Sequence, residues 1–395
     1  MNAGMRGDSR TPTERPIYLD YNATTPVDPL VFAAMRPYLQ EDFGNPSSGH
    51  VYGQAAHEAV ERARRQVADL LGAQPEEIVF TGGGSEADNL AICGVAFSQR
   101  EQRRHIVTTA VEHPAVLNTC RYLQRRHGFQ LTVLPVDRTG LVDPDEVRRA
   151  IRDDSVLVSV MHAQNEVGTV QPVAEIAAVA RERGVAFHTD AAQSAGKVPV
   201  RVHDLDVDLL TVAGHKLYAP KGVGALYVRS GLTLEPLIHG AGHEAGRRAG
   251  TENVAGIVGL GKACALARKN LNTEMSRLGG LRDELWRRLT AAIPGLRLHG
   301  HPDRRLPNTL NVGVPGVAGE DLLAAAPGIA ASTGSACHAG RTEPSGVLLA
   351  MGLTPTEALT AVRLSLGRFT TGEDVRRVAD MLVAAAAKLR GTHRD

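Results

Sequence analysis

A lysine, an aspartate and a run of glycines are the residues whose types and order suggest chemistry. Residues 82–84 are all glycine and stand between a β-branched stretch and a helical pattern, so backbone amides and a helix N-terminus can approach an anion there. Asp190 and Lys216 each follow a strand-like stretch, and open α/β sheets bind ligands at those strand ends. A phosphate cradle, a carboxylate for a ring nitrogen and a Schiff-base amine are what pyridoxal 5'-phosphate (PLP) requires.

Each of these features also has a simpler explanation when it is taken alone. The glycines could form a tight turn with Ser85 as a helix N-cap, Asp190 could cap a helix, and Lys216 could lie on the surface. A nucleotide-triphosphate loop is nearly matched at residues 256–263, but Ala263 replaces the serine or threonine and no strand precedes it. The order of the three features along the chain is what favours the cofactor interpretation.

Two further polar residues follow strand-like stretches. His113 comes after the stretch 105–109, where an imidazole could stack on a cofactor ring and move a proton. Asn165 follows the stretch 156–161 and could bind a cofactor oxygen or a substrate carboxylate. A loop histidine and a turn-forming asparagine are the alternatives.

Cys337 is surrounded by small residues and glycines, which favours an accessible loop. A thiol there could attack a substrate sulfur, whereas Cys93, Cys120 and Cys264 occur in helical patterns and are predicted to be buried. No Cys-x-x-Cys pair suggests a zinc or disulfide site, and we expect no metal. Arg363 has the rigid fork that suits a carboxylate, with a solvated arginine as the alternative.

The composition limits the class of protein. The 395 residues are 43% hydrophobic and 22% charged, with a formal net charge of +1, so a folded globular chain is expected and the charge gives no general reason to bind nucleic acid or an anionic membrane. The N-terminus lacks the apolar core of a signal peptide, and no apolar run is long enough to span a bilayer. We therefore expect a cytoplasmic enzyme without nucleic-acid or membrane partners.

The elements that position these residues alternate between strand and helix patterns, which predicts an α/β fold with a mainly parallel sheet flanked by helices. Strands are expected at 78–81, 105–109, 131–136, 156–161, 186–189, 209–212, 225–228, 309–314 and 329–332, and helices at 51–71, 255–289 and 375–389. Residues 1–15 are predicted to be a poorly ordered N-terminus, 16–260 a large cofactor-binding domain, and 261–395 a smaller α+β domain carrying Cys337. The N-terminal strand is expected to be able to join the smaller domain.

Eight short motifs, in order along nearly the whole chain, resemble the cysteine desulfurases of the NifS and IscS branch. They are residues 18–26 (YLDYNATTP), 82–86 (GGGSE), 112–113 (EH), 165–168 (NEVG), 190–193 (DAAQ), 214–216 (GHK), 247–253 (RRAGTEN) and 334–337 (GSAC). Each motif is weak alone, but their order and spacing are specific.

The resemblance implies a fold-type I PLP homodimer that converts L-cysteine to L-alanine. By this resemblance, the residues that bind the cofactor are Lys216, Asp190, Gln193, Gly84, Ser85, His113, Asn165, His215 and, from the other subunit, Thr251. Arg363, with Asn165, would bind the substrate. Cys337, Lys216 and His113 would be catalytic, and Cys337 would carry the sulfur as a persulfide to an acceptor or scaffold protein, for example for iron-sulfur cluster assembly.

One residue departs from the family pattern, because Ala213 stands where many relatives have a serine that reaches the phosphate. Two other functions stay open at this point. A selenocysteine lyase would use the same cofactor chemistry, and a docking platform for sulfur-accepting proteins would make catalysis secondary.

Overall fold

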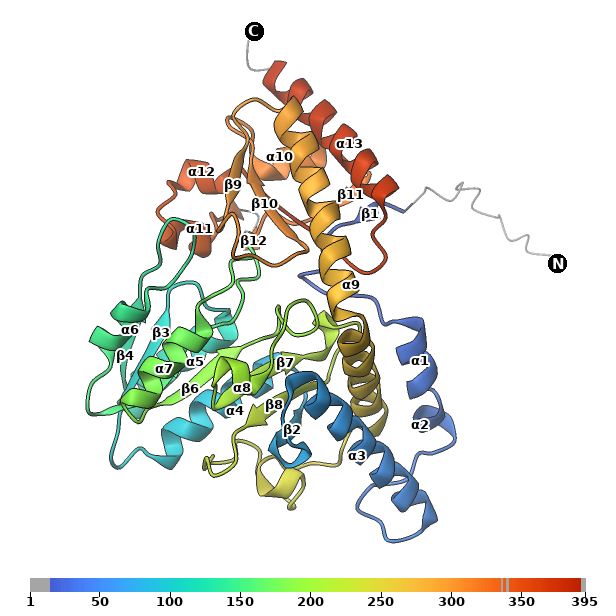
Figure 1. Ribbon diagram of the computed structural model, residues 1–395, viewed down its shortest axis with the longest axis vertical. Helices are drawn as coiled ribbons and strands as arrows, with labels where there is room; N and C mark the ends of the chain where they lie inside the picture. The colour runs from blue at the N-terminus through green and yellow to red at the C-terminus, as the bar shows by residue number, and fades with distance from the viewer. Residues whose placement is uncertain (1–14, 335–336, 339–340, 392–395) are drawn as a thin grey trace, which may run out of the picture.

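The computed structural model describes residues 15–334, 337–338 and 341–391, with the side chains of 337, 338, 341 and 342 left out. The predicted poorly ordered N-terminus therefore lies almost wholly outside the described residues. The chain forms a large body around one sheet and a smaller body above it, joined by a long helix (Figure 1).

The large body is built on a seven-stranded sheet in the order β2-β8-β7-β6-β5-β3-β4. The strands are β2 (Ile78–Thr81), β3 (His105–Thr109), β4 (Gln130–Leu134), β5 (Ser155–Ser159), β6 (Ala186–Asp190), β7 (Leu209–Ala213) and β8 (Gly224–Val228). The run from β7 to β4 is parallel, while β8 pairs antiparallel with both β2 and β7. The prediction of a mainly parallel α/β sheet is confirmed.

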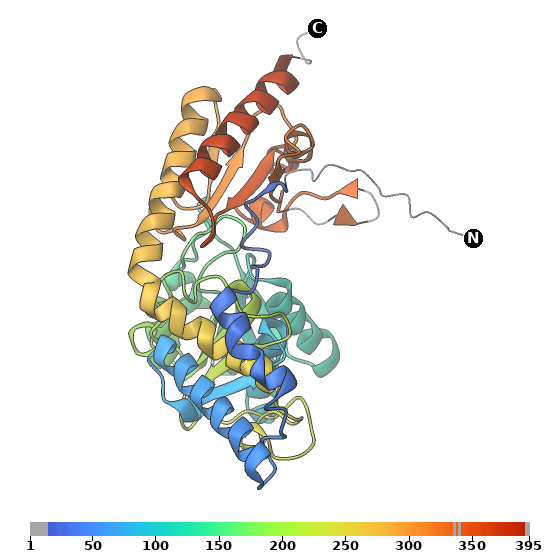
Figure 2. The ribbon, with the colours of Figure 1, turned by 90° about the vertical axis from the view of Figure 1, so that its right-hand side faces the viewer.

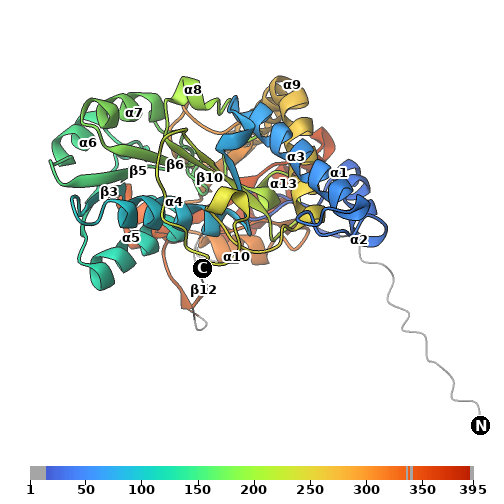
Figure 3. The same ribbon diagram turned by 90° about the horizontal axis from the view of Figure 1, so that it is seen from below.

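Helices cover both faces of this sheet, as parallel strands require. They are α3 (Val51–Leu71), α4 (Gly84–Ser98), α5 (Pro114–His127), α6 (Pro144–Ala150), α7 (Val173–Glu182) and α8 (Val202–Leu205). The short helices α1 (Pro29–Met35) and α2 (Pro37–Gln40) pack against α9 (Val254–Ala292). The helices α4 and α5 pack on the face that carries Ile106 and Leu157, while α3, α6 and α7 pack on the face that carries Val107 and Val158. Figure 3 shows these two layers on either side of the strands.

The smaller body has an antiparallel sheet in the order β14-β10-β9. Its elements are β9 (Arg297–His299), β10 (Thr309–Gly313), α10 (Gly319–Ala324), β11 (Ile329–Ala330), β12 (Cys337–His338), β13 (Arg341–Thr342), α11 (Gly346–Ala350), α12 (Pro355–Leu359), β14 (Ala361–Ser365) and α13 (Gly372–Gly391). The N-terminal strand β1 (Ile17–Tyr18) pairs with β11, and Leu19 packs in this second core.

Helix α9 (Val254–Ala292) joins the two bodies without a break. Its first half packs Ile257 and Leu260 into the core of the large body, and its second half packs Leu285 and Leu289 into the core of the small one. The second half runs beside α13 (Figure 2). The division proposed between residues 260 and 261 thus falls inside this helix.

Candidate active site

A cavity of about 620 Å³ opens at the carboxyl ends of β6 and β7, where α4 begins. Nine of the ten residues predicted to bind the cofactor or the substrate line this cavity: Gly84, Ser85, His113, Asn165, Asp190, Gln193, His215, Lys216 and Arg363. The tenth, Thr251, was predicted to serve the site of the other subunit. These residues come from widely separated segments, and the fold brings them to one place. The roles given to them stay predictions.

The glycine run forms the turn that enters α4. Gly83 is the N-cap with a φ of 149°, no side chain caps the helix, and the first amides of a helix have no acceptor within it. Gly84 lies so close to β7 that a Cβ atom there would be 3.0 Å from the Cβ of Ala213. Ser85 is inside the helix, so the alternative in which it is the N-cap is wrong. The first turn of α4 can therefore receive an anion.

Replacing Ala213 by serine is expected to strengthen this anion site. A hydroxyl at position 213 would lie beside Gly84 and could add one charge-assisted hydrogen bond, worth about 1.5–3 kcal/mol. We expect Ala213→Ser to lower the dissociation constant for PLP about ten-fold or more, measured by fluorescence titration of cofactor-free protein. Ala213→Val, which adds volume without a donor, is the control, and equal affinity of the serine variant and the parent would contradict the expectation.

Lys216 ends the 3₁₀ turn η2 (Gly214–Lys216) directly after β7. Its Nζ donates to the main-chain oxygens of Asn22, at 2.6 Å, and Ala23, at 2.7 Å. Burial, with the nearby charge of Arg363, lowers the pKa of Lys216 to about 8. Because the neutral amine is the nucleophile, this lowered pKa suits an amine that must react with an aldehyde near neutral pH.

Asp190 is a buried carboxylate at the end of β6, where its Oδ1 accepts a hydrogen bond from the amide of Ala192 at 2.8 Å. Burial raises its pKa, whereas His113 and Lys216 act in the opposite direction. Two more carboxyl groups, Asp88 and Glu112, are buried nearby, and burial raises the pKa of Glu112 to about 8 and that of Asp88 well above its ordinary range. The nearby His113 and Lys216 favour the charged form of Asp190, which lines the cavity.

The two histidines of the cavity are held neutral. His113 is the N-cap of α5, where its Nδ1 accepts the amide N–H of Ala115 at 3.2 Å and leaves Nε2 for other contacts; partial burial lowers its pKa. His215 Nδ1 lies 3.1 Å from Thr24 Oγ1, and burial with the nearby Lys216 lowers the pKa of His215 to about 4.

Arg363, on β14, brings the small body to the edge of the cavity. Its Nη1 donates to the main-chain oxygen of Asn165 at 3.2 Å and its Nη2 to Asp20 Oδ1 at 2.6 Å. Its Nε is buried and has no partner among the described residues. A carboxylate entering the cavity would therefore meet an arginine that is oriented but not fully bonded.

Sequence reasoning gave no role to several cavity residues. Asn22, Thr24 and Lys221 line the cavity, and Asp20 holds Arg363. Asn22 belongs to the family motif at 18–26, but neither a strand pattern nor a glycine run marks that segment as a ligand site.

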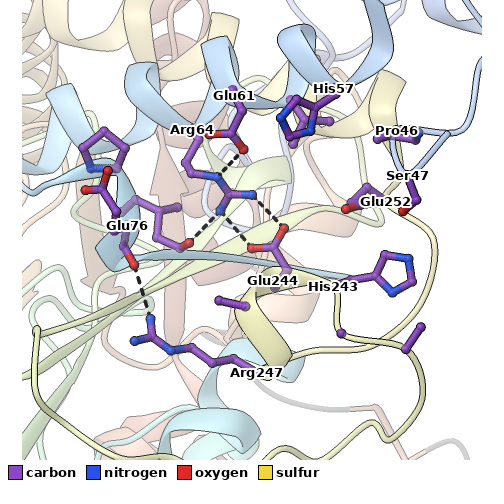
Figure 4. Close-up of a pocket in the computed structure, with 16 residues that line it drawn as sticks. Pro46, Ser47, His57, Glu61, Arg64, Glu76, His243, Glu244, Arg247 and Glu252 are labelled. Atoms are coloured by element: carbon purple, nitrogen blue, oxygen red, sulfur yellow. Dashed lines mark hydrogen bonds and ion pairs between the residues drawn. The ribbon is translucent and has the colours of Figure 1, made fainter. Parts of the chain in front are cut away.

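Thr251 does not line this cavity. It is exposed, beside a neighbouring hollow of about 90 Å³. It follows the short 3₁₀ turn η3 (Glu244–Gly246), which Figure 4 shows held by Arg64 of α3. Both hydrogen bonds from Arg64 to the Glu244 carboxylate are 2.9 Å long, and the same carboxylate accepts the amide N–H of Phe80.

The backbone of this turn is strained. Glu244, Ala245 and Gly246 have φ angles of 49°, 54° and 80°, and two of the three are not glycine. Left-handed non-glycine residues persist only when their surroundings fix them. The side chains of Arg64 and Glu244, only 12% and 2% exposed, supply that fixation, so α3 sets the position of the loop that carries Thr251.

The three other cysteines are buried, as predicted. Burial raises the pKa of Cys93 and of Cys264 to about 12 and raises that of Cys120 further, so none is a ready nucleophile. Cys337 itself lies in β12, and its side chain is outside the described part of the chain. The β12–β13 pair stands out from the small body (Figures 2 and 3).

Comparison with known proteins decides the family. The profile of class-V aminotransferases matches residues 17–378. The chain belongs to the class-V aminotransferase family. Among its class-V relatives, a cysteine desulfurase IscS from Methanosarcina thermophila is 49% identical over 386 residues, covering 97% of this chain and 95% of the relative. This agrees with the motif resemblance.

Solved structures confirm the fold of this class-V chain. A NifS-like protein superposes with a TM-score of 0.88 at 37% identity, covering 94% of this chain and 99% of that one. A structure described as SspA in complex with cysteine superposes with a TM-score of 0.80 at 40% identity, covering 90% and 99%. Within the described residues, no helix has the length and apolar content to cross a membrane, and no group of three or more His, Cys, Asp or Glu side chains could hold a metal ion.

Proposed function

We propose that this protein is a PLP-dependent L-cysteine desulfurase. The observation that carries the proposal is the amine of Lys216, with its pKa lowered to about 8, in one cavity with the Asp190 carboxylate and the start of α4. Relatives whose sequences are about half identical to this one are named cysteine desulfurase, and one structurally similar protein was solved in complex with cysteine.

The residues of the cavity fit PLP. Gly84, Ser85 and His215 would hold its phosphate, Asp190 its ring nitrogen and Gln193 its ring oxygen, with His113 against the ring face and Lys216 bonded to its aldehyde carbon. When bound, PLP supplies a carbon that holds the substrate amine and a ring that accepts electrons.

The reaction then depends on side chains of this chain. Arg363 and Asn165 bind and orient the carboxylate of cysteine, and Lys216 takes and returns the proton at Cα. The Cys337 thiol would give its proton to His113, and its thiolate would attack the substrate sulfur, so that a sulfur–sulfur bond forms while the bond between Cβ and sulfur breaks. Cβ would take up a proton from His113 and Cα would regain its proton from Lys216, which gives alanine, and Cys337 keeps the extra sulfur as a persulfide.

The two ends of the segment that carries Cys337 support this role. Ser332 forms backbone hydrogen bonds with Arg363, and Ser345 Oγ donates to Glu166 Oε2 at 2.5 Å. Glu166 follows Asn165, so both ends of the segment lie against residues at the cavity. We propose that Cys337 passes its sulfur to an acceptor or scaffold protein. The cytoplasmic location expected from the sequence stays a prediction.

Alanine formation tests the function directly. Purified protein with PLP is expected to convert L-cysteine to L-alanine in the presence of a thiol reductant, and Cys337→Ser is expected to bind PLP normally but to form alanine from cysteine at least about 100-fold more slowly. Cys264→Ser, which alters a buried thiol, is the control. No alanine from the parent protein would refute the proposal, and alanine only from selenocysteine would favour a selenocysteine lyase.

We also propose that the active form is a homodimer. Six large apolar side chains are exposed on α1, α2, the segment that follows α2 and the start of α3: Leu30, Phe32, Leu39, Phe43, Val51 and Tyr52. Such a cluster on one part of a surface is typical of an interface. In such a dimer, the exposed Thr251 could contribute to the cofactor site of the other subunit, as the family pattern implies.

Charged substitutions in this cluster are expected to separate the subunits. Phe43 and Val51 are each 72% exposed, so Phe43→Asp with Val51→Asp should leave the monomer folded while placing two charges in the interface. Light scattering after size exclusion is expected to give twice the chain mass for the parent and the chain mass for the variant. Tyr122→Asp, 47% exposed on α5, is the control; a monomeric parent or a dimeric double variant would contradict the assignment.

A further inference from the structure

Lys197 is a lysine that the proposed reaction does not use. It lies in the turn after β6, and its Nζ donates to Gln193 Oε1 at 2.9 Å and to Asn22 Oδ1 at 3.1 Å. Both acceptors are neutral amides, and no carboxylate forms an ion pair with Lys197 in the described part of the chain. Burial, together with the charges of Lys216 and Arg363, lowers the pKa of Lys197 to about 7.

Lys197 and the main-chain oxygen of Asn22 together favour one orientation of the Gln193 amide. A side-chain amide has an oxygen that only accepts and a nitrogen that only donates, whereas an ammonium group has three donors and no acceptor. Contact with the ammonium form of Lys197 therefore requires the oxygen of Gln193 on that side. The Nε2 atom then donates one hydrogen to the main-chain oxygen of Asn22 at 2.9 Å, and its second hydrogen is left for a ligand.

Asn22 is fixed in the same way. Its Oδ1 also accepts from Asn308 at 3.0 Å, and its Nδ2 donates to Thr309 Oγ1 at 2.8 Å. Its main-chain oxygen accepts from both Gln193 and Lys216. Lys197 thus belongs to a connected set of hydrogen bonds that ends at the amine of Lys216.

We propose that Lys197 is a positioning residue that turns the N–H side of Gln193 toward the anionic ring oxygen of the cofactor. The inference rests on the proposed function, because that oxygen belongs to PLP. Without Lys197, only the hydrogen bond to the main-chain oxygen of Asn22 would favour this orientation. Gln193 could then turn its carbonyl oxygen toward the ring oxygen, which would repel an anionic oxygen.

This orientation has a spectroscopic consequence. The ring oxygen shares a proton with the nitrogen that joins PLP to Lys216, and a hydrogen bond donated to that oxygen withdraws negative charge from it. The shared proton then leaves at lower pH. Loss of Lys197 should therefore raise the pH midpoint of the visible absorbance change of the bound cofactor.

The experiment is a pH titration of that absorbance in purified protein loaded with PLP. Lys197→Met is expected to raise the midpoint by about one pH unit, the size of a lost charge-assisted hydrogen bond. Lys197→Arg, which keeps a donor-only cation, is expected to restore most of the shift. If the methionine variant does not fold, Lys197→Gln removes the charge while keeping a polar chain.

A double-mutant cycle separates positioning from a direct effect of charge. In the Gln193→Met background, the further change Lys197→Met is expected to leave the midpoint unmoved. An equal shift in both backgrounds would overturn the inference, as would an unchanged midpoint in Lys197→Met alone. Lys269→Met, at an exposed site on α9, is the control; a parent protein that shows no cofactor absorbance would overturn the proposed function and this inference with it.

Discussion

Lys216→Ala is expected to abolish desulfurase activity and the covalent attachment of PLP. The variant loses the group that bonds to the cofactor and the group that moves the proton at Cα, and the second loss alone costs about 10²–10⁴-fold in rate. Within the described residues, Lys216 Nζ donates to the main-chain oxygens of Asn22 and Ala23 and forms no ion pair, so the fold should persist without it. Alanine formation and the intact mass after borohydride reduction are the measurements.

Lys269→Ala, on the exposed face of α9, is the control for a lost lysine. Borohydride is expected to fix one PLP per chain to the parent and to the control, and none to Lys216→Ala. A covalent PLP adduct in Lys216→Ala would mean that another lysine, such as Lys221 at the edge of the same cavity, holds the cofactor.

Arg64→Met is expected to lower the free energy of unfolding by about 3–5 kcal/mol, because it leaves the buried Glu244 carboxylate without its cation. The turn at Glu244 should then lose its strained backbone conformation. If Thr251 serves the cofactor site of a second subunit, as we propose, the variant should also bind PLP more weakly. Urea unfolding and PLP titration measure the two effects.

Arg62→Met is the matched control, since Arg62 lies two residues away on α3 and its ion pair with Glu58 is exposed. Surface pairs contribute about 0–1 kcal/mol, so little change in the free energy of unfolding is expected.

Mixed dimers provide the second check. A dimer with one Arg64→Met subunit and one Lys216→Ala subunit is expected to retain normal PLP affinity when the intact loop faces the intact lysine; normal affinity in Arg64→Met homodimers would contradict the role of the loop.

Much of the fold could be predicted because its signals are local. The strand at 78–81 and the helix at 51–71 have the predicted bounds, and most other strands differ by only a residue or two at their ends, where β-branched runs do not define the last hydrogen bond. The backbone at Glu244 could not be predicted. Neither Glu244 nor Ala245 favours a left-handed conformation, and the partner that fixes it, Arg64, is far away in the sequence.

The cavity residues predicted from strand ends, Asp190 and Lys216, are brought together, because the topology of a parallel sheet places such ends at one edge. Asp20 and Lys197 were missed for the opposite reason. Each acts through contact with a residue chosen by the tertiary fold, Arg363 for the first and Gln193 for the second, and no local pattern marks such a contact.

The continuity of α9 has a consequence for how this protein comes apart. A single helix supplies side chains to both cores, so unfolding of one core would disturb the helix that packs in the other. Heating should therefore unfold the whole molecule in one cooperative transition. Gly279 and Gly280 lie in that helix with open space where their side chains would be, and each glycine weakens a helix interior by about 1 kcal/mol. Amide hydrogen exchange at these two residues should therefore be faster than in the interior turns of α9 on either side.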